Sequence, residues 1–311
     1  MKVSVIMPCY NGGTFLESAV RSALAQENCE WEVEVMVIND HSDDAYTLEL
    51  MDQLAKLPGV RVVSNTGNRG IAAGRNFGMA ASDADWFAFL DGDDLWLPHS
   101  MQARIEAWKL FPQAEILSGD HAIFNGEIPQ EPEPFVAARL NRYANVASAF
   151  KSGRPIGLSK PVDLFVGAIP MWVGTVIIKR SVFEKVGVFD EQLRRAQDVN
   201  MWLRASRVAD VAFTPRIVAL YRQHAGAITA EEGPPGKGSA LSYQKLHDMP
   251  EFAAHRKALR RVIGYSHNRD AVYYRRRGRY AEAVKASLRG LRADLRNPLI
   301  WKNLAASVVR R

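Results

Sequence analysis

The first 120 residues alternate short apolar runs with segments whose apolar residues recur at helical spacing. The expected strands are 3–7, 33–38, 60–63 and 86–90, and the expected helices are 14–26, 46–57, 71–81 and 98–111. In the first helix, Leu16, Val20, Ala23 and Leu24 fall on one stripe. Continuous apolar strands are typical of a sheet that helices cover on both faces. The alternation predicts the α/β class, with a mostly parallel sheet flanked by helices.

The rest of the chain is less regular. Segment 125–170 predicts loops and short helices that line a pocket, and it is followed by strands at 175–178, 211–213 and 218–221 and helices at 181–185 and 197–207. Segment 226–240 contains EEGPPGKGS, which predicts a flexible loop or linker. About three helices follow, with breaks at 278 and 297–298. We therefore expect a catalytic-type domain at 1–225, a linker at 226–240 and a helical C-terminal appendage at 241–311.

Composition narrows the class of protein. The 311 residues are 47% hydrophobic and 24% charged, which favours a folded globular protein over a disordered or fibrous one. No apolar run approaches the roughly 18 residues that a membrane-spanning helix needs, and residues 1–8 read as a strand rather than a secretion signal. The two cysteines, Cys9 and Cys29, provide neither a disulfide framework nor a zinc site. These features predict a cytoplasmic protein.

The charge is unevenly distributed. The net charge is +6, but residues 255–311 contain 16 basic and 3 acidic residues, a net charge of +13, so the remainder carries −7. A basic segment suits an anionic membrane surface, a nucleic acid or an acidic partner; no nucleic-acid recognition motif accompanies it. The densest group is Arg275, Arg276, Arg277 and Arg279, close to Tyr273, Tyr274 and Tyr280. One expectation is peripheral docking on the inner membrane face; the alternative is that these helices only cap the acidic domain.

The most informative segment is 86–96, in which an apolar strand is followed by Asp91, Asp93 and Asp94. Ligands of open parallel sheets bind beyond the carboxyl ends of the strands. Three carboxylates at such an end repel one another unless a cation lies among them. Hard oxygen ligands without His or Cys favour Mg²⁺ or Mn²⁺ bridged to phosphates over structural zinc. The alternative is that these residues form a turn and cap a helix that begins near Leu95.

The usual glycine-rich phosphate loops of dinucleotide-binding and P-loop proteins are absent from the sequence. Instead, the whole pattern resembles the inverting family-2 nucleotide-sugar glycosyltransferases, which have the GT-A fold. The matching segments are VSVIMPCYN, VEVMVINDHSDD, NRGIAAGRNFGMAAS, WFAFLDGDDLW, GTVIIKRSVFEKVGVFDE, AQDVNMWLR and YRQH. They occur in the family's order across residues 3–224, and together they are far more specific than any one of them.

The resemblance implies a role for individual residues. It assigns nucleotide-sugar binding to Pro8, Tyr10, Asp40, Arg75 and Asp91, metal binding to Asp91, Asp93 and His224, and the role of catalytic base to Asp198. Two positions depart from the family pattern, since Gln197 replaces a frequently acidic residue and His41 replaces a small one. Taken singly, each residue also has an ordinary structural explanation. Asp198 would be a helix N-cap, Asp40 a turn residue, Arg75 a surface residue and His224 a satisfied loop histidine.

These observations predict an inverting glycosyltransferase dependent on Mn²⁺ or Mg²⁺. It would move a sugar from a nucleotide donor, expected to be a UDP-sugar, to a hydroxyl of a glycan or lipid-linked acceptor. A sugar nucleotidyltransferase is one alternative, but it would need a basic loop after the first strand, and 8–13 contains no Lys or Arg. A non-catalytic nucleotide-sugar or glycan-binding module is another, and it would be favoured if Asp198 or the carboxylate pair were absent.

Overall fold

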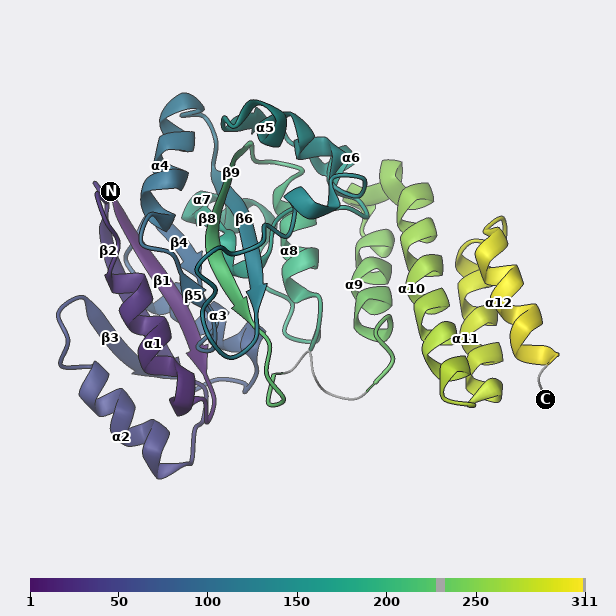
Figure 1. Cartoon of the computed structure of the whole chain (residues 1–311), viewed down its shortest axis with the longest axis horizontal. Coiled ribbons are helices and arrows are strands. Elements are labelled where there is room, and N and C mark those ends of the chain that lie inside the picture. The colour runs from purple at the N-terminus through teal and green to yellow at the C-terminus, as the bar shows by residue number, and fades with distance from the viewer. Residues whose placement is uncertain (228–232, 310–311) are drawn as a thin grey trace. The chain divides into compact units, whose positions relative to one another are not determined.

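The computed structural model describes residues 1–227 and 233–309. The chain divides into two compact units (Figure 1). The first comprises Met1–Glu191 and Met201–Ala227, and the second comprises Gln192–Asn200 and Ile228–Arg311. The first unit thus ends two residues beyond the predicted boundary at 225. Residues 192–200 group with the C-terminal helices, which the sequence pattern did not indicate.

The described part of the first unit contains a nine-stranded mixed sheet in the order β3-β2-β1-β4-β8-β6-β9-β5, with β7 paired to β9. The strands are β1 (Lys2–Cys9), β2 (Glu32–Asn39), β3 (Val60–Ser64), β4 (Trp86–Phe89), β5 (Leu95–Trp96), β6 (Ile116–Phe124), β7 (Ile156–Leu158), β8 (Ile177–Lys179) and β9 (Val211–Arg222). The β3-β2-β1-β4 half is parallel, whereas β8 runs antiparallel to both β4 and β6. The predicted α/β class is confirmed.

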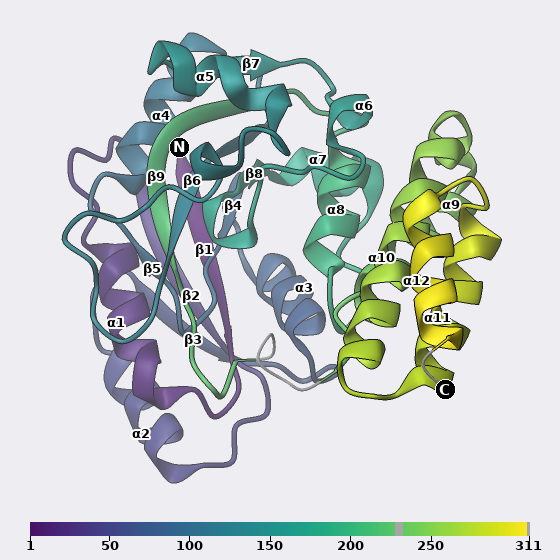
Figure 2. The ribbon, with the colours of Figure 1, turned by 45° about the vertical axis from the view of Figure 1, so that its right-hand side comes forward.

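Helices cover both faces of this sheet. They are α1 (Gly13–Leu24), α2 (Ala45–Leu54), α3 (Ile71–Ala81), α4 (Ser100–Leu110), α5 (Ala147–Ser152), α6 (Val162–Phe165), α7 (Arg180–Val186) and, continuing from the second unit, α8 (Gln197–Ala205). The buried face of α1 packs with Val3, Val5 and Met7 of β1. A Cβ on Gly78 of α3 would lie 2.6 Å from Ile6 Cγ2. Because alternate strand residues point to opposite faces, α1 and α3 lie on opposite sides of β1, as Figure 2 shows.

Two expectations about the later strands are corrected. The predicted strands 211–213 and 218–221 are one strand, β9, which continues past Pro215 because its pairing with β6 shifts register there. Strands β5 and β6 were not predicted, nor was β7, which lies in the segment 125–170 that was expected to contain only loops and short helices. The pattern of β6 is interrupted by polar residues that are nevertheless buried; the Asp120 carboxylate, for example, accepts hydrogen bonds from the backbone N–H groups of Val136 and Ala137.

The second unit contains the four described helices α9 (Lys237–Asp248), α10 (Arg256–Arg276), α11 (Tyr280–Ala293) and α12 (Pro298–Val308), which pack side by side (Figure 2). The predicted breaks are confirmed, because Gly278 takes a left-handed φ of 73° and Asn297 caps α12. The loop predicted at 226–240 ends earlier than expected, because α9 begins at Lys237. Residues 228–232 of the predicted loop lie outside the described part of the chain. Among the described residues, no helix has the length and apolarity required to cross a bilayer.

The first unit also buries a neutral histidine. His121 is 6% exposed, and its ring stacks on Phe135 with centroids 4.5 Å apart. Burial, reinforced by the charge of Arg139, lowers the pKa of His121 to about 3. Between this value and the ordinary histidine pKa of about 6.5, the unfolded chain binds a proton that the folded chain does not. The free energy of unfolding should therefore fall as the pH is lowered through this range.

We predict that His121 contributes about 1.4 kcal/mol per pH unit to the loss of stability as the pH falls below about 6.5. The variant His121→Gln should lose stability less steeply with acid than the wild type. Denaturant unfolding at several pH values measures this slope, and the exposed histidine variant His41→Gln is the control. Equal slopes for wild type and His121→Gln would show that His121 is protonated in the folded protein.

Candidate nucleotide-sugar site

The loops that follow β1 and β2 are connected through Asn11. Its backbone has a φ of 47°, a left-handed conformation that asparagine tolerates better than most residues. Asn11 Nδ2 donates to Asp43 Oδ1 at 2.7 Å, and Asn11 Oδ1 accepts from the backbone N–H groups of Asp43 and Asp44. The backbone N–H of Asn11 donates to Ser42 Oγ at 3.1 Å. The two strand ends are therefore fixed relative to each other.

Asp40 joins a third segment to these loops. It is 4% exposed, its Oδ1 accepts from Asn65 Nδ2 at 2.8 Å and its Oδ2 accepts from the backbone N–H of Gly70 at 2.8 Å. These bonds hold the start of α3 beside the ends of β1 and β2. A carboxylate has about four lone-pair sites, so two remain for a further donor. The role of Asp40 in base binding stays a prediction.

Arg75 of α3 is buried, with 1% of its surface exposed, which corrects the interpretation of Arg75 as a surface residue. Its Nη2 donates to Asp91 Oδ1 at 2.5 Å. Its Nε and Nη1 atoms are buried and have no hydrogen-bond partner among the described residues. A buried guanidinium with unused N–H groups is a costly arrangement that an anionic ligand would relieve. The structure thus brings Arg75 and Asp91 together.

Asp93 meets His224 across 131 residues of sequence, with Asp93 Oδ2 3.0 Å from His224 Nε2. Both side chains keep some exposure, 30% and 24% respectively. Burial and the charge of Asp91 raise the pKa of Asp93, whereas its hydrogen bond with His224 lowers it. The pairing of these two predicted metal-binding residues leaves both able to face a ligand.

Asp94 and Arg222 support the Asp93–His224 pair through hydrogen bonds with the backbone. Asp94 is 1% exposed; its Oδ1 accepts from the backbone N–H of Arg222 at 2.8 Å, and Arg222 Nε donates to the Asp93 carbonyl at 2.8 Å. Burial, followed by the charges of Asp93 and Asp91, raises the pKa of Asp94. The proposed helix-capping alternative for these aspartates is wrong, because strand β5 follows them and α4 begins only at Ser100.

Pro8 and Tyr10 lie at the end of β1. A Cβ on Gly74 would lie 3.0 Å from Pro8 Cβ and 3.8 Å from Asp40 Cγ, so Pro8 is close to both α3 and Asp40. Tyr10 is 39% exposed, and the Arg69 guanidinium carbon lies 3.5 Å from the centre of its ring. An exposed tyrosine with a cation stacked on it offers a flat face and a positive charge together.

Asp198 lies in the first turn of α8 and belongs to the second unit, whereas Asp91 and Asp93 belong to the first. Its Oδ1 accepts from the backbone N–H of Val199 at 2.8 Å. The residue before the helix, Ala196, has a left-handed φ of 57°, a conformation that is strained for alanine. Since α8 begins at Gln197, Asp198 is inside the first turn rather than at the N-cap. Its role as the base stays a prediction.

Three contact residues were not identified from sequence. Arg222 contacts Asp93 and Asp94, and the Phe15 ring lies 4.8 Å from that of His224 and 4.5 Å from the Arg222 guanidinium carbon. Arg69 is the third, stacked on Tyr10. Arg69 and Arg222 are basic residues in segments that also contain predicted site residues, and this was the sequence signal available for them. Phe15 gave none, because a single aromatic residue at the start of a helix is usually part of the core.

Among residues 1–227 and 233–309, no group of three or more His, Cys, Asp or Glu side chains is arranged to hold a metal ion. The Asp93–His224 pair provides two potential ligands. Mg²⁺ sites commonly combine one or two carboxylates with substrate phosphates and several waters, and Asp93 with the neighbouring Asp91 fits that kind of site. Water and donor phosphates would fill the remaining coordination positions.

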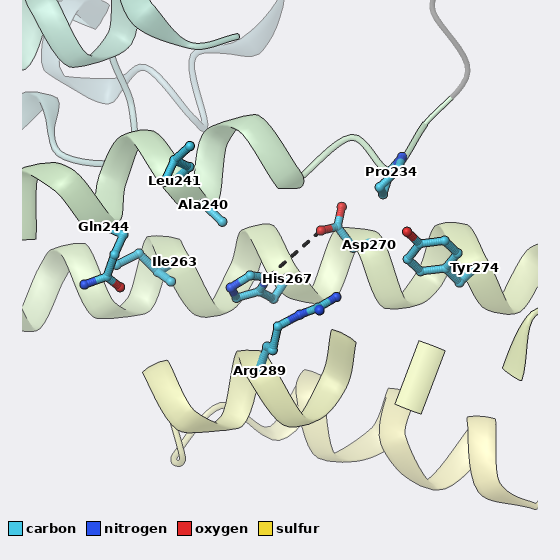
Figure 3. A pocket seen from close by; sticks show the side chains of 9 residues that line it. All are labelled: Pro234, Ala240, Leu241, Gln244, Ile263, His267, Asp270, Tyr274 and Arg289. Atoms are coloured by element: carbon cyan, nitrogen blue, oxygen red, sulfur yellow. Dashed lines mark ion pairs between the residues drawn. The ribbon is translucent and has the colours of Figure 1, made fainter. Parts of the chain in front are cut away.

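The second unit has its own cavity of about 430 Å³, shown in Figure 3. It is lined by Pro234, Ala240, Leu241, Gln244, Ile263, His267, Asp270, Tyr274 and Arg289. His267 Nδ1 lies 4.0 Å from Asp270 Oδ2, and burial, reinforced by the charge of Arg289, lowers the pKa of His267. None of the predicted site residues lines this cavity.

The chain is similar to known glycosyltransferases. Residues 4–143 match the model of the family "Glycosyl transferase family 2". An uncharacterized glycosyltransferase of Rickettsia conorii is 25% identical over 228 residues, which is 71% of this chain and 34% of that protein. An uncharacterized protein of Mycobacterium tuberculosis is 27% identical over 233 residues, 73% of this chain and 69% of that protein. The chain spans only about a third of the Rickettsia conorii relative.

Solved structures share the fold. The structure of Staphylococcus aureus TarS residues 1–349 in complex with UDP-GlcNAc has a TM-score of 0.64 and 17% identity, covering 94% of this chain and 81% of that one. The same region of TarS in complex with UDP has a TM-score of 0.61, 16% identity and coverage of 99% and 89%. Residues 4–143 thus resemble the family-2 glycosyltransferases, and the chain shares its fold with the TarS structures.

We predict that the Arg75–Asp91 pair stabilises the site's framework. Replacing Arg75 by Met should cost about 1–3 kcal/mol of unfolding free energy, because it leaves the partly buried Asp91 carboxylate without its partner. Arg69→Met removes a more exposed arginine and should cost less than about 1 kcal/mol. Denaturant unfolding of the two variants measures the difference. Equal stabilities would show that the Asp91 charge is compensated by solvent instead of by Arg75.

Proposed function

We propose that the chain transfers a glycosyl group from a nucleotide-sugar donor to an acceptor hydroxyl with inversion at the anomeric carbon. The observation that carries this proposal is the meeting of Arg75 with Asp91 and of Asp93 with His224 beside the ends of β1 and β4. This is the edge of the sheet where ligands of open α/β sheets bind. The family match and the glycosyltransferase relatives support the same chemistry.

The donor is proposed to be a UDP-sugar. Support comes from the shared fold of TarS, whose structures hold UDP-GlcNAc or UDP. Pro8, Tyr10 and Asp40 would receive the base, Asp91 the ribose, and Arg75, with its unused buried N–H groups, the base or the phosphates. Of the alternatives, a nucleotidyltransferase and a non-catalytic module both lack a specific observation in their favour.

Asp93 and His224 are proposed to hold Mn²⁺ or Mg²⁺ with the donor diphosphate, and Asp91 lies close enough to raise the pKa of Asp93. A bound divalent cation would neutralise charge on the departing diphosphate. Arg222 keeps the Asp93 backbone in position through its Nε hydrogen bond. The burial of Asp94 against Arg222 keeps the loop's third carboxylate away from the ligand.

Asp198 is proposed as the single base that one-step inversion requires. Its carboxylate would take the proton of the acceptor hydroxyl as that oxygen forms a bond to the anomeric carbon. The bond between this carbon and the diphosphate oxygen breaks in the same step, and the electron pair leaves with the nucleoside diphosphate. The proposed acceptor is a glycan or a lipid-linked saccharide, with the basic second unit docked on the anionic inner face of a membrane.

Asp93→Ala is expected to weaken Mn²⁺-dependent binding of UDP at least tenfold, about 1.4 kcal/mol, since one metal-holding carboxylate is removed. The fold should survive, because the side chain is partly exposed and its carboxylate is destabilised by its neighbours. Calorimetry with UDP in the presence and absence of Mn²⁺ measures the effect, with the exposed Asp52→Ala as control. Wild-type affinity in a folded Asp93→Ala protein would remove Asp93 from the metal site.

Asp198→Asn keeps the side-chain shape but cannot accept a proton. Donor binding is expected to persist, while turnover falls by about 100-fold or more. Steady-state kinetics together with UDP-sugar binding separate the two effects, and Asp52→Asn is the control. Turnover within a few-fold of wild type would exclude Asp198 as the base, and a product that retains the donor's anomeric configuration would exclude the inverting mechanism.

A further inference from the structure

The arginine-rich group that the sequence pointed to is largely occupied by contacts inside the second unit. Arg275 Nη2 donates to Asn303 Oδ1 at 3.2 Å. The Arg277 guanidinium carbon lies 3.9 Å from the centre of the Tyr273 ring. Arg279 pairs with Glu282 at 2.8 Å. Arg276, Arg277 and Arg279 stay exposed, but the neighbouring Tyr273, Tyr274 and Tyr280 are half-buried, so this group offers cations without exposed apolar side chains beside them in the sequence.

Large apolar side chains are exposed at the connection between α11 and α12. Leu295, Leu299 and Trp301 are 66%, 54% and 49% exposed, and Leu288 one turn before the end of α11 is 47% exposed. The other six tryptophans, all within the described residues, are buried or half-buried. The Trp301 indole N–H donates to the Leu295 carbonyl at 2.9 Å, so the ring is held against the connection rather than left loose.

Cationic side chains accompany these apolar ones. Arg289, Arg292, Arg296 and Lys302 are exposed, whereas Asp294, the single acidic residue of segment 288–302, is half-buried. The segment carries a net charge of +3. Exposed Leu and Trp with Arg and Lys between them match the interface of an anionic bilayer, where the apolar groups enter the headgroup boundary and the cations contact phosphates. We call residues 288–302 the α11–α12 surface.

We propose that the α11–α12 surface is the part of the chain that contacts an anionic lipid surface, and that the group Arg275–Arg279 is not. The inference rests on the proposed membrane association and specifies where it occurs. Charge complementarity favours lipid over a second copy of the chain, because two copies meeting at this surface would bring two groups of cations together. Lipid contact would then combine apolar insertion with electrostatic attraction, and it would weaken with salt but not vanish.

The test is co-sedimentation with vesicles of phosphatidylcholine alone or mixed with phosphatidylglycerol, using the whole chain. Wild type should bind only the mixed vesicles. The double variant Leu295→Ser/Leu299→Ser should lose at least tenfold in vesicle affinity. Trp301→Ala should also lose affinity, whereas Tyr265→Ala, which truncates an equally exposed ring on α10, should not. Thermal melting and UDP binding of each variant check that the fold and donor site are unchanged.

Two double variants, each of which removes two positive charges, show which cations contribute the electrostatic attraction to the vesicles. Each cation close to an anionic leaflet contributes about fivefold to the binding constant. Arg292→Gln/Arg296→Gln should therefore lose at least tenfold, whereas Arg276→Gln/Arg277→Gln should change affinity less than about threefold. Equal losses for the two pairs, or unchanged binding by the leucine variant, would overturn the assignment of the α11–α12 surface while leaving membrane association intact.

Two other outcomes are distinguishable from these. If the wild type does not bind mixed vesicles at low salt, both the proposed membrane association and this inference are wrong. Glycosyl transfer to a soluble acceptor tests the proposed enzymatic activity separately. Light scattering of wild type that gives a dimer, with Leu295→Ser/Leu299→Ser giving a monomer, would show that a second copy covers the surface and would overturn the lipid assignment.

Discussion

The repulsion among Asp91, Asp93 and Asp94 is the constraint on which the site depends. Three carboxylates within four consecutive positions after a strand require compensation, and each receives a different partner: the buried Arg75 guanidinium, His224, and the backbone N–H of Arg222. The partners come from α3 and from the end of β9, so the loop after β4 is fixed between two distant segments of the chain. A loop held in this way presents Asp91 and Asp93 while it buries Asp94.

The neighbouring loops are fixed by polar side chains instead of apolar packing. Asn11 joins the ends of β1 and β2, and Asp40 joins β2 to the start of α3 through Asn65 and Gly70. Hydrogen bonds of this kind position backbone and side chains while leaving a polar surface for a ligand. The result is a polar edge of the sheet supported by an apolar core, a division that suits the binding of a nucleotide diphosphate.

Much of this arrangement was predictable from sequence, and the reasons for the exceptions are physical. The parallel strands β1 to β4 are continuous apolar runs, so their pattern is clear, and the motif order identified the residues at their ends. Strand β6 was not predicted because its residues Asp120 and His121 are polar but buried. Their burial depends on tertiary contacts such as those with the backbone donors of Val136 and Ala137. The role of Arg222 was not predicted because its contacts with Asp93 and Asp94 join residues that are about 130 positions apart in the sequence. Where Asp198 lies relative to Asp93 stays a prediction.

The antiparallel insertion of β8 between β4 and β6 has a consequence for the order of folding. The β3-β2-β1-β4 half lies within the first 89 residues of the chain, so it can form while the ribosome is still adding later residues. The contacts of Arg222 and His224 with the carboxylate loop must wait until β9 has been synthesised and has paired with β6. Until then, of the residues that contact the three carboxylates across the fold, only Arg75 is in place. The contacts that fix the proposed donor site are thus completed late in synthesis, after the β3-β2-β1-β4 half can already exist.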